Sequence, residues 1–194
     1  MTAQWNGEGM LRLVLLGAPG SGKGTQASEL AAATGARHIS TGDLLRAEVA
    51  AGTELGCRVA GYLDAGELVP DDVLQTLTLP LIEAAAADSG YLLDGYPRSV
   101  EQATELAARI SERAAVTRVV FLSVPRAELV DRLLRRAAEQ GRSDDSAEVI
   151  ERRLQVFEDE TSSLIDYYRE AGLLATVDGA ADPAEVHRRI RTVL

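Results

Sequence analysis

A glycine-rich stretch directly after a short apolar run constrains the fold more than any other feature of the chain. Residues 11–16 read LRLVLL, and residues 17–25 read GAPGSGKGT. Short, nearly continuous apolar runs are typical of strands that are covered on both faces of a parallel sheet. Glycine tolerates positive φ and carries no Cβ, so such a loop can turn several backbone N–H groups toward one ligand. The sequence therefore predicts a strand, a phosphate-binding loop and a helix, in that order.

The same loop holds the only lysine of the chain, Lys23, whereas the other basic residues are all arginines. A lysine at this point can bridge the β- and γ-phosphates of a nucleotide, and Thr25 offers a hydroxyl near the accompanying metal. Gly24 separates Lys23 from Thr25, which departs from the standard phosphate-loop pattern. The alternative is an ordinary glycine-rich turn, but the flanking strand and helix favour the phosphate site.

Apolar strand patterns alternate with helical patterns along the rest of the chain. The predicted strands are residues 11–16, 36–39, 91–93, 119–124 and 174–177. The predicted helices are residues 23–34, 41–50, 55–65, 71–87, 100–113, 126–139, 147–170 and 182–194. This alternation indicates right-handed crossovers and a parallel sheet with helices on both faces. We expect one doubly wound α/β domain over residues 1–194, with residues 1–9 as a flexible tail and ligands at the carboxyl ends of the strands.

Charge and cysteine content exclude several classes of protein. Thirty acidic against twenty basic residues give a formal net charge of −10, which repels nucleic-acid backbones and anionic membranes. No apolar run reaches the roughly 18 residues of a membrane span. The single cysteine, Cys57, provides neither a disulfide framework nor a four-thiolate zinc site. We therefore expect a cytoplasmic protein with no nucleic-acid or membrane partner.

Two further motifs lie near predicted strand ends. Residues 39–46 read ISTGDLLR, in which a Ser/Thr cap enters a helix and Arg46 faces back along it. Taken alone, that motif favours an ordinary helix N-cap with a solvated arginine. Residues 91–98 read YLLDGYPR, where Asp94 ends a strand at the edge at which phosphates would lie. Gly95 and Pro97 then force a tight turn that aims Arg98 into the cleft.

These motifs resemble those of the adenylate kinase family, specifically its short-lid form. The resemblance rests on GAPGSGKGTQ, ISTGDLLRAEV, DAGELVPDD, YLLDGYPRSVEQA and GRSDD with a downstream Glu-Arg-Arg, in register from Met10 to the C-terminus. It implies reversible transfer of the γ-phosphoryl group of MgATP to AMP, giving two ADP, for adenine nucleotide balance and salvage. Because the AMP phosphate is already an oxyanion, this reaction needs no side-chain nucleophile and no strong base. The two histidines, His38 and His187, lie outside the motifs and are interpreted as packing or surface residues.

The resemblance assigns nucleotide contacts to residues along the whole chain. The ATP site comprises Gly20, Ser21, Gly22, Lys23, Gly24, Thr25, Arg132, Arg136 and Gly179, the last against the adenine. The AMP site comprises Thr41, Arg46, Glu67, Leu68, Val69, Gly95, Tyr96, Pro97, Arg98, Gln102, Arg142 and Arg153. The catalytic set comprises Lys23, Arg98, Arg132, Arg136, Arg142 and Arg153.

The chemistry of the side chains is consistent with the roles that the resemblance implies. The planar forks of Arg46 and Arg98 suit the AMP phosphate, and the amide of Gln102 can both donate and accept at an adenine edge. The remaining arginines of the catalytic set close over the transferring group. Asp94 belongs to the water shell of Mg²⁺, with Thr25 as a further candidate. Arg135 and Arg152 are interpreted as structural.

Only five residues separate Arg136 from Arg142, so the longer lid that many bacterial members carry is missing here. We therefore expect no structural zinc. Cover for the site is expected from a short lid at residues 135–145, flexing near Gly141, and from a mobile AMP-binding segment at residues 40–69. Cys57 lies inside that mobile segment and is interpreted as a small, half-buried residue.

Two alternative functions remain in view. A uridylate/cytidylate kinase shares the fold, the loop and the short lid, although Thr41 and Gln102 favour AMP. A nucleotide-dependent switch would need either a guanine-reading Asn-Lys-x-Asp, which a chain whose one lysine is already used cannot supply, or a residue that orients a hydrolytic water. Members with this lid are usually monomers, and we expect a monomer that binds ATP, AMP and ADP. Selectivity for ATP over GTP is left open, since that contact is largely backbone.

Overall fold

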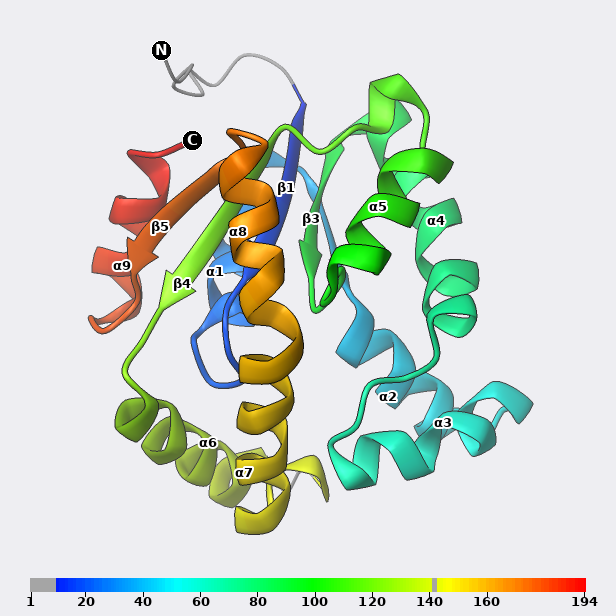
Figure 1. Ribbon diagram of the computed structural model, residues 1–194, viewed down its shortest axis with the longest axis vertical. Coiled ribbons are helices and arrows are strands. Elements are labelled where there is room, and N and C mark those ends of the chain that lie inside the picture. Colours follow the sequence, from blue (N-terminus) through cyan, green and yellow to red (C-terminus); the bar gives the residue numbers. More distant parts are fainter. Residues whose placement is uncertain (1–9, 141–142) are drawn as a thin grey trace.

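A five-stranded, all-parallel sheet forms the centre of the computed structural model, which describes residues 10–140 and 143–194 (Figure 1). The strands are β1 (Leu11–Leu16), β2 (Arg37–Ser40), β3 (Gly90–Asp94), β4 (Arg118–Ser123) and β5 (Leu174–Asp178), and their order in the sheet is β2-β3-β1-β4-β5. The strand before the glycine-rich loop is therefore central, with β3 on one side and β4 on the other. In this topology ligands bind at the carboxyl ends of the strands, where β1 runs into the loop.

The two faces of the sheet are covered by different helices. In β1, Val14 and Leu16 join a core with α2, α4, α5 and α8, whereas Leu13 and Leu15 join a core with α1 and α9. The predicted doubly wound α/β fold is confirmed. A third cluster joins Ala18 of the glycine-rich loop to leucines of α6 and α7, so these two helices pack directly on the loop.

Most predicted elements are present with ends shifted by one to three residues. The helices are α1 (Lys23–Thr34), α2 (Thr41–Ala51), α3 (Glu54–Ala65), α4 (Asp71–Asp88), α5 (Val100–Arg109), α6 (Arg126–Gln140), α7 (Ala147–Val156), α8 (Ser162–Glu170) and α9 (Pro183–Arg191). Short 3₁₀ turns occupy Glu112–Ala114 and Ser143–Asp145. No helix in the described ranges is both long enough and apolar enough to cross a membrane.

Two predicted helices differ from the structure in an informative way. The helix predicted to end at residue 113 ends at Arg109, because Glu83 of α4 accepts hydrogen bonds from the backbone N–H and the hydroxyl of Ser111 at 2.6 and 2.9 Å. The single helix predicted over residues 147–170 is interrupted by a π-helical segment, Phe157–Thr161.

Two helical arms lie beyond the carboxyl ends of the strands. Figure 1 shows α2 and α3 on one side of that edge and α6 and α7 on the other. The predicted lid, residues 135–145, spans the end of α6 and the 3₁₀ turn Ser143–Asp145, but Gly141 and Arg142 lie outside the described residues, as does the predicted tail.

Candidate active site

One large cavity of about 910 Å³ opens at the carboxyl edge of the sheet. Its walls come from the glycine-rich loop, α2, the turn after β3, α6, the α7–α8 region and the turn after β5. Arg98, Arg132, Arg136 and Arg153 of the predicted catalytic set line it. Seven residues of the predicted ATP site line it beside them: Gly20, Ser21, Gly22, Lys23, Gly24, Thr25 and Gly179. The structure thus gathers side chains from distant stretches of sequence around a single space.

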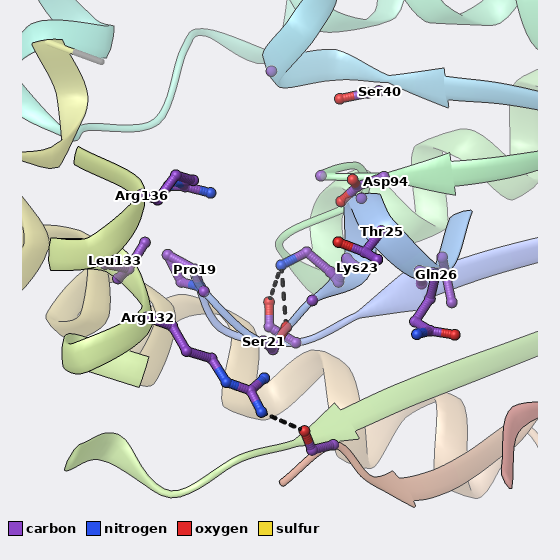
Figure 2. A pocket seen from close by; sticks show the side chains of 18 of the residues that line it. Pro19, Ser21, Lys23, Thr25, Gln26, Ser40, Asp94, Arg132, Leu133 and Arg136 are labelled. Atoms are coloured by element: carbon purple, nitrogen blue, oxygen red, sulfur yellow. Dashed lines mark hydrogen bonds between the residues drawn. The ribbon is translucent and has the colours of Figure 1, made fainter. Parts of the chain in front are cut away.

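The ammonium of Lys23 is turned back onto its own loop (Figure 2). Its Nζ donates to the carbonyl oxygens of Gly17 at 2.8 Å and of Ala18 at 3.0 Å. Gly20 has φ +83°, and a Cβ there would lie 2.9 Å from Cγ of Leu133 on α6, so only glycine fits this close approach. Burial lowers the pKa of Lys23 to about 8, because a charged ammonium is poorly solvated there. Neighbouring arginines also act to lower this pKa, and the carboxylate of Asp94 at the end of β3 acts to raise it.

Asp94 is the last residue of β3 and lies beside the start of α1. A Cβ on Gly24 would lie 3.6 Å from Oδ2 of Asp94, and Nε2 of His38 on β2 lies 3.7 Å from the same oxygen. Burial opposes ionisation of Asp94, but His38 and the charges of Lys23 and Arg98 outweigh burial and hold its pKa below the ordinary value. A carboxylate therefore faces the cavity at neutral pH.

The turn after β3 directs the guanidinium of Arg98 into the cavity. Its backbone N–H donates to Oε1 of Gln102 at 2.7 Å, and its Nε donates to the carbonyl oxygen of Gly95 at 2.8 Å. The Tyr96–Pro97 peptide bond is cis. Burial lowers the pKa of Arg98 to about 10, and the nearby charge of Arg153 acts in the same direction. Arg98 still carries its charge at neutral pH, and the carboxylates of Asp94 and Asp144 compensate that charge in part.

Two residues of the predicted AMP site are engaged elsewhere. Tyr96 is 1% exposed and packs in the core beneath the turn. Gln102 is also 1% exposed, and its Nε2 donates to Oδ1 of Asp71 at 2.6 Å while its Oε1 accepts from Arg98. Recognition of an adenine edge by Gln102 therefore requires one of these bonds to be exchanged.

Nine of the remaining residues of the predicted AMP site line two adjoining cavities, and Arg142 lies outside the described residues. A smaller cavity beside the large one is lined by Thr41, Arg46, Glu67, Leu68, Val69, Gly95, Arg98 and Arg153, and Pro97 lines the large cavity. The hydroxyl of Thr41 donates to the carbonyl oxygen of Asp94 at 3.4 Å, and the carboxylate of Glu67 pairs with Arg152 of α7 at 2.7 Å. The predicted structural role of Arg152 agrees with this pairing.

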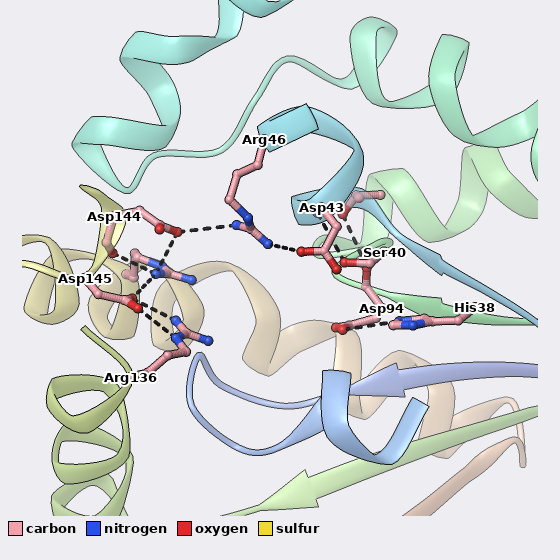
Figure 3. Close-up of polar contacts among 10 residues, drawn as sticks. His38, Ser40, Asp43, Arg46, Asp94, Arg136, Asp144 and Asp145 are labelled. Carbon is pink, nitrogen blue, oxygen red and sulfur yellow. Dashed lines mark hydrogen bonds and ion pairs between the residues drawn. The ribbon is translucent and has the colours of Figure 1, made fainter. Parts of the chain in front are cut away.

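Asp144 and Asp145 hold three of the arginines by ion pairs (Figure 3). Asp145 accepts two hydrogen bonds from Arg136, both at 2.7 Å, and one from Arg153 at 2.8 Å. Asp144 lies 3.0 Å from Arg153 and 3.6 Å from Arg46. Both carboxylates are buried, so they act as counter-ions where phosphate oxygens would compete.

Arg132 and Arg136 share one face of α6 but have different partners. Arg132 donates to the carbonyl oxygen of Gly179 at 2.9 Å and pairs with Glu128 at 2.5 Å (Figure 2). Arg135, predicted to be structural, lines the cavity as well.

Sequence reasoning missed several residues of the cavity wall. His38, interpreted as a packing residue, lines the cavity, as do Phe157 and Thr161 of the π-helical segment. The two counter-ion carboxylates were also missed, although the quoted motif GRSDD contains them. Their position between the arginines of two successive predicted helices was the available signal.

Comparison with known proteins identifies the family. A family model described as adenylate kinase matches residues 15–173. An adenylate kinase from Stenotrophomonas maltophilia (strain R551-3) is 49% identical over 183 residues, which cover 93% of this chain and 97% of that protein. Adenylate kinases from Thermus thermophilus and Micrococcus luteus are each 46% identical, over 94% and 93% of this chain and 96% and 89% of their own lengths.

Family membership and geometry agree on the chemistry. The expectation drawn from the sequence motifs is confirmed by matches that extend over nearly the whole chain. A cavity lined by a phosphate loop, a lysine and convergent arginines suits transfer of a phosphoryl group between two polyanions. The chain belongs to the adenylate kinase family and is an enzyme of reversible phosphoryl transfer that converts ATP and AMP into two ADP and so balances adenine nucleotides.

Proposed function

We propose that the triphosphate of ATP lies in the loop of residues 17–25 and that the AMP phosphate lies between Arg46 and Arg98. One observation carries this assignment: Lys23 and arginines from α2, the turn after β3, α6 and α7 converge on one cavity of a molecule whose net charge is −10. The carboxylates of Asp144 and Asp145 balance part of this charge, and phosphate oxygens would balance the rest. Gly179, whose carbonyl oxygen accepts from Arg132 at 2.9 Å, is assigned to the adenine end of ATP.

Catalysis in this assignment consists of positioning and charge neutralisation. The AMP oxyanion attacks the γ-phosphorus in line with the leaving ADP oxygen, so the protein supplies no nucleophile. Lys23, Arg132, Arg136, Arg142 and Arg153 neutralise the charge that spreads over the transferring oxygens. The hydrogen bonds of Lys23 to two loop carbonyls support a loop that has its phosphate-binding conformation before the nucleotide binds.

Magnesium ion is assigned to the phosphates of ATP, with Asp94 holding its water shell and Thr25 near it. The fit rests on a carboxylate that stays ionised beside Gly24 and faces the cavity. Within the described part of the chain no three His, Cys, Asp or Glu side chains form a metal-binding group. Magnesium binds readily in such a setting, because it keeps several waters and takes few protein ligands. When bound, the ion neutralises phosphate charge and orients the γ-phosphoryl group.

Closure is proposed for the segment of residues 40–69 and for the lid of residues 135–145. Their contact across the cavity supports this, since Nη1 of Arg46 lies 3.6 Å from Asp144. Closure excludes the water that would otherwise accept the γ-phosphoryl group.

We further propose that the protein is a cytoplasmic monomer without nucleic-acid or membrane partners. Light scattering of the purified protein tests whether it is a monomer.

A dinucleotide of two adenosines joined by five phosphates tests the site assignment, because it must span both nucleotide positions. Calorimetry is expected to give one molecule bound per chain and competition with both ATP and AMP. The Arg98→Gln variant is expected to weaken binding at least tenfold, whereas Arg188→Gln, on the exposed face of α9, leaves binding unchanged. A dinucleotide that competes with ATP but not with AMP contradicts the assignment.

Acceptor preference is tested separately by comparing AMP, CMP and UMP at fixed MgATP. AMP is expected to give the highest kcat/KM. A higher kcat/KM for CMP would overturn the choice of acceptor and leave the phosphate contacts standing.

A further inference from the structure

The π-helical segment changes which side chains of the α7–α8 helix face the cavity. Arg153 of α7, Phe157 and Thr161 all line it. In an unbroken α-helix of 3.6 residues per turn, position 161 would be rotated by about 80° from position 153. One additional residue in a π-turn rotates the following chain back by about 100°, so Thr161 returns to the face of Arg153. Figure 1 shows α7 and α8 as one long coil that runs from the region of α6 to the sheet.

Thr161 makes an unusual hydrogen bond for a threonine of a helix. Thr34, Thr78 and Thr104 donate their hydroxyls to the carbonyl oxygen four residues earlier, at 2.7, 2.6 and 2.8 Å, which is the common pattern. The hydroxyl of Thr161 donates instead to the carbonyl oxygen of Arg98, 3.1 Å away and 63 positions earlier in the chain. Thr161 is 5% exposed, so water does not readily replace this bond.

The backbone of Arg98 is thereby held on both sides. Its N–H donates to Gln102 of α5 at 2.7 Å, and its carbonyl oxygen accepts from Thr161 at 3.1 Å. The Nε of Arg98 is also bonded to the carbonyl oxygen of Gly95. The position of the Arg98 main chain therefore sets where the two terminal nitrogens of its guanidinium point. A small shift of that carbonyl moves the fork relative to any phosphate it holds.

We infer that Thr161 is a positioning residue for the acceptor phosphate, acting through the main chain of Arg98, and that the π-helical segment exists to bring it there. The inference rests on the proposed assignment of Arg98 to AMP. The hydrogen bond from Thr161 to Arg98 links the α7–α8 helix, which carries Arg153, to the turn that carries Arg98, and it does not involve the nucleotide. Loss of the hydroxyl should therefore affect the acceptor and leave the donor unchanged.

Steady-state kinetics of the Thr161→Val variant test the inference, because Val keeps the volume and removes the hydroxyl. We expect KM for AMP to rise about fivefold, the factor of one lost neutral hydrogen bond, with KM for ATP unchanged. Thr161→Ser, which keeps a hydroxyl, is expected to restore KM for AMP to within about twofold of the wild type. Thr104→Val on the exposed side of α5 is the matched control and is expected to behave as the wild type.

The possible results separate this inference from the proposed function. Wild-type protein that does not convert ADP into ATP and AMP refutes the function itself. With an active wild type, a normal KM for AMP in Thr161→Val overturns the inference, and so does an equal rise in both KM values or a Ser variant as impaired as the Val variant. If circular dichroism shows that Thr161→Val does not fold, Thr161→Ala takes its place under the same criteria.

Discussion

Two glycines of α3 provide a paired test of how closely α2 and α3 approach each other. Gly56 is buried where the two helices meet, and a Cβ on it would lie 2.1 Å from the carbonyl oxygen of Glu48 and 2.7 Å from the backbone nitrogen of Val49. Gly61, on the same helix, is exposed, and a Cβ on it would meet nothing within 4 Å. The same substitution to alanine should therefore have opposite effects at the two positions.

The magnitudes follow from those surroundings. Gly61→Ala removes a glycine from a helix interior, which stabilises by about 0.5–1 kcal/mol and raises Tm by about 1–4 °C in a domain of this size. Gly56→Ala gains the same helix propensity, but the obstructing atoms are backbone and cannot rotate away. The helices must separate by more than about 1 Å, and overpacking of this kind costs about 1–3 kcal/mol. Taken as the net cost, this corresponds to a fall in Tm of about 2–12 °C.

Differential scanning calorimetry of the two variants beside the wild type measures these shifts directly. Because α2 and α3 carry the segment proposed to close on AMP, Gly56→Ala is also expected to raise KM for AMP, and Gly61→Ala is not. The reasoning is refuted if Gly56→Ala melts at or above the wild-type temperature, or if both variants shift Tm in the same direction.

Three further predictions concern the charged groups. Lys23→Met should retain its circular dichroism spectrum and lose more than 90% of kcat in a coupled assay, on the order of the 10³-fold that such cations contribute; turnover above a tenth of the wild type contradicts its role. Because Lys23 is cationic below its pKa of about 8 and neutral above it, kcat/KM for ATP should fall as pH rises through that value, and a flat profile to pH 9.5 would rule this out. Asp145→Asn loses a charge-assisted bond to Arg136 or Arg153, about 1.5–3 kcal/mol, so Tm should fall by about 3–12 °C. The exposed Asp166→Asn, which breaks a surface pair, should shift Tm by less than about 2 °C, and equal shifts would contradict the burial argument.

Local chemistry made much of the fold predictable from the sequence. The run before Gly17, the loop and the helix from Lys23 were each specified by residues within a few positions of one another. The π-helical segment left no comparable signal, because one extra residue in a turn changes neither composition nor the apolar pattern on which the prediction rested. Its acidic residues, Glu158, Asp159 and Glu160, are exposed and are equally typical of an ordinary α-helix surface.

The site was predictable wherever a motif fixed a residue to a strand end or a loop. Five arginines around the cavity, Arg46, Arg98, Arg132, Arg136 and Arg153, were predicted as site residues, whereas Arg135 was predicted to be structural. The partners of Gln102 and of Arg136 were not foreseen, because they depend on how α4 lies against α5 and how α6 lies against the turn at Asp145. Tertiary packing of separate helices sets those distances, and the linear sequence does not encode them in any local pattern.

The buried pair of carboxylates at positions 144 and 145 changes what substrate affinity measures in this enzyme. Guanidinium groups that are already matched to an internal anion exchange one partner for another when a phosphate arrives, so the measured affinity is the difference between two strong attractions. Added salt screens the attraction of the guanidinium groups to the carboxylates as well as their attraction to the phosphates. Nucleotide affinity should therefore depend on ionic strength less steeply than a cluster of bare positive charges would require.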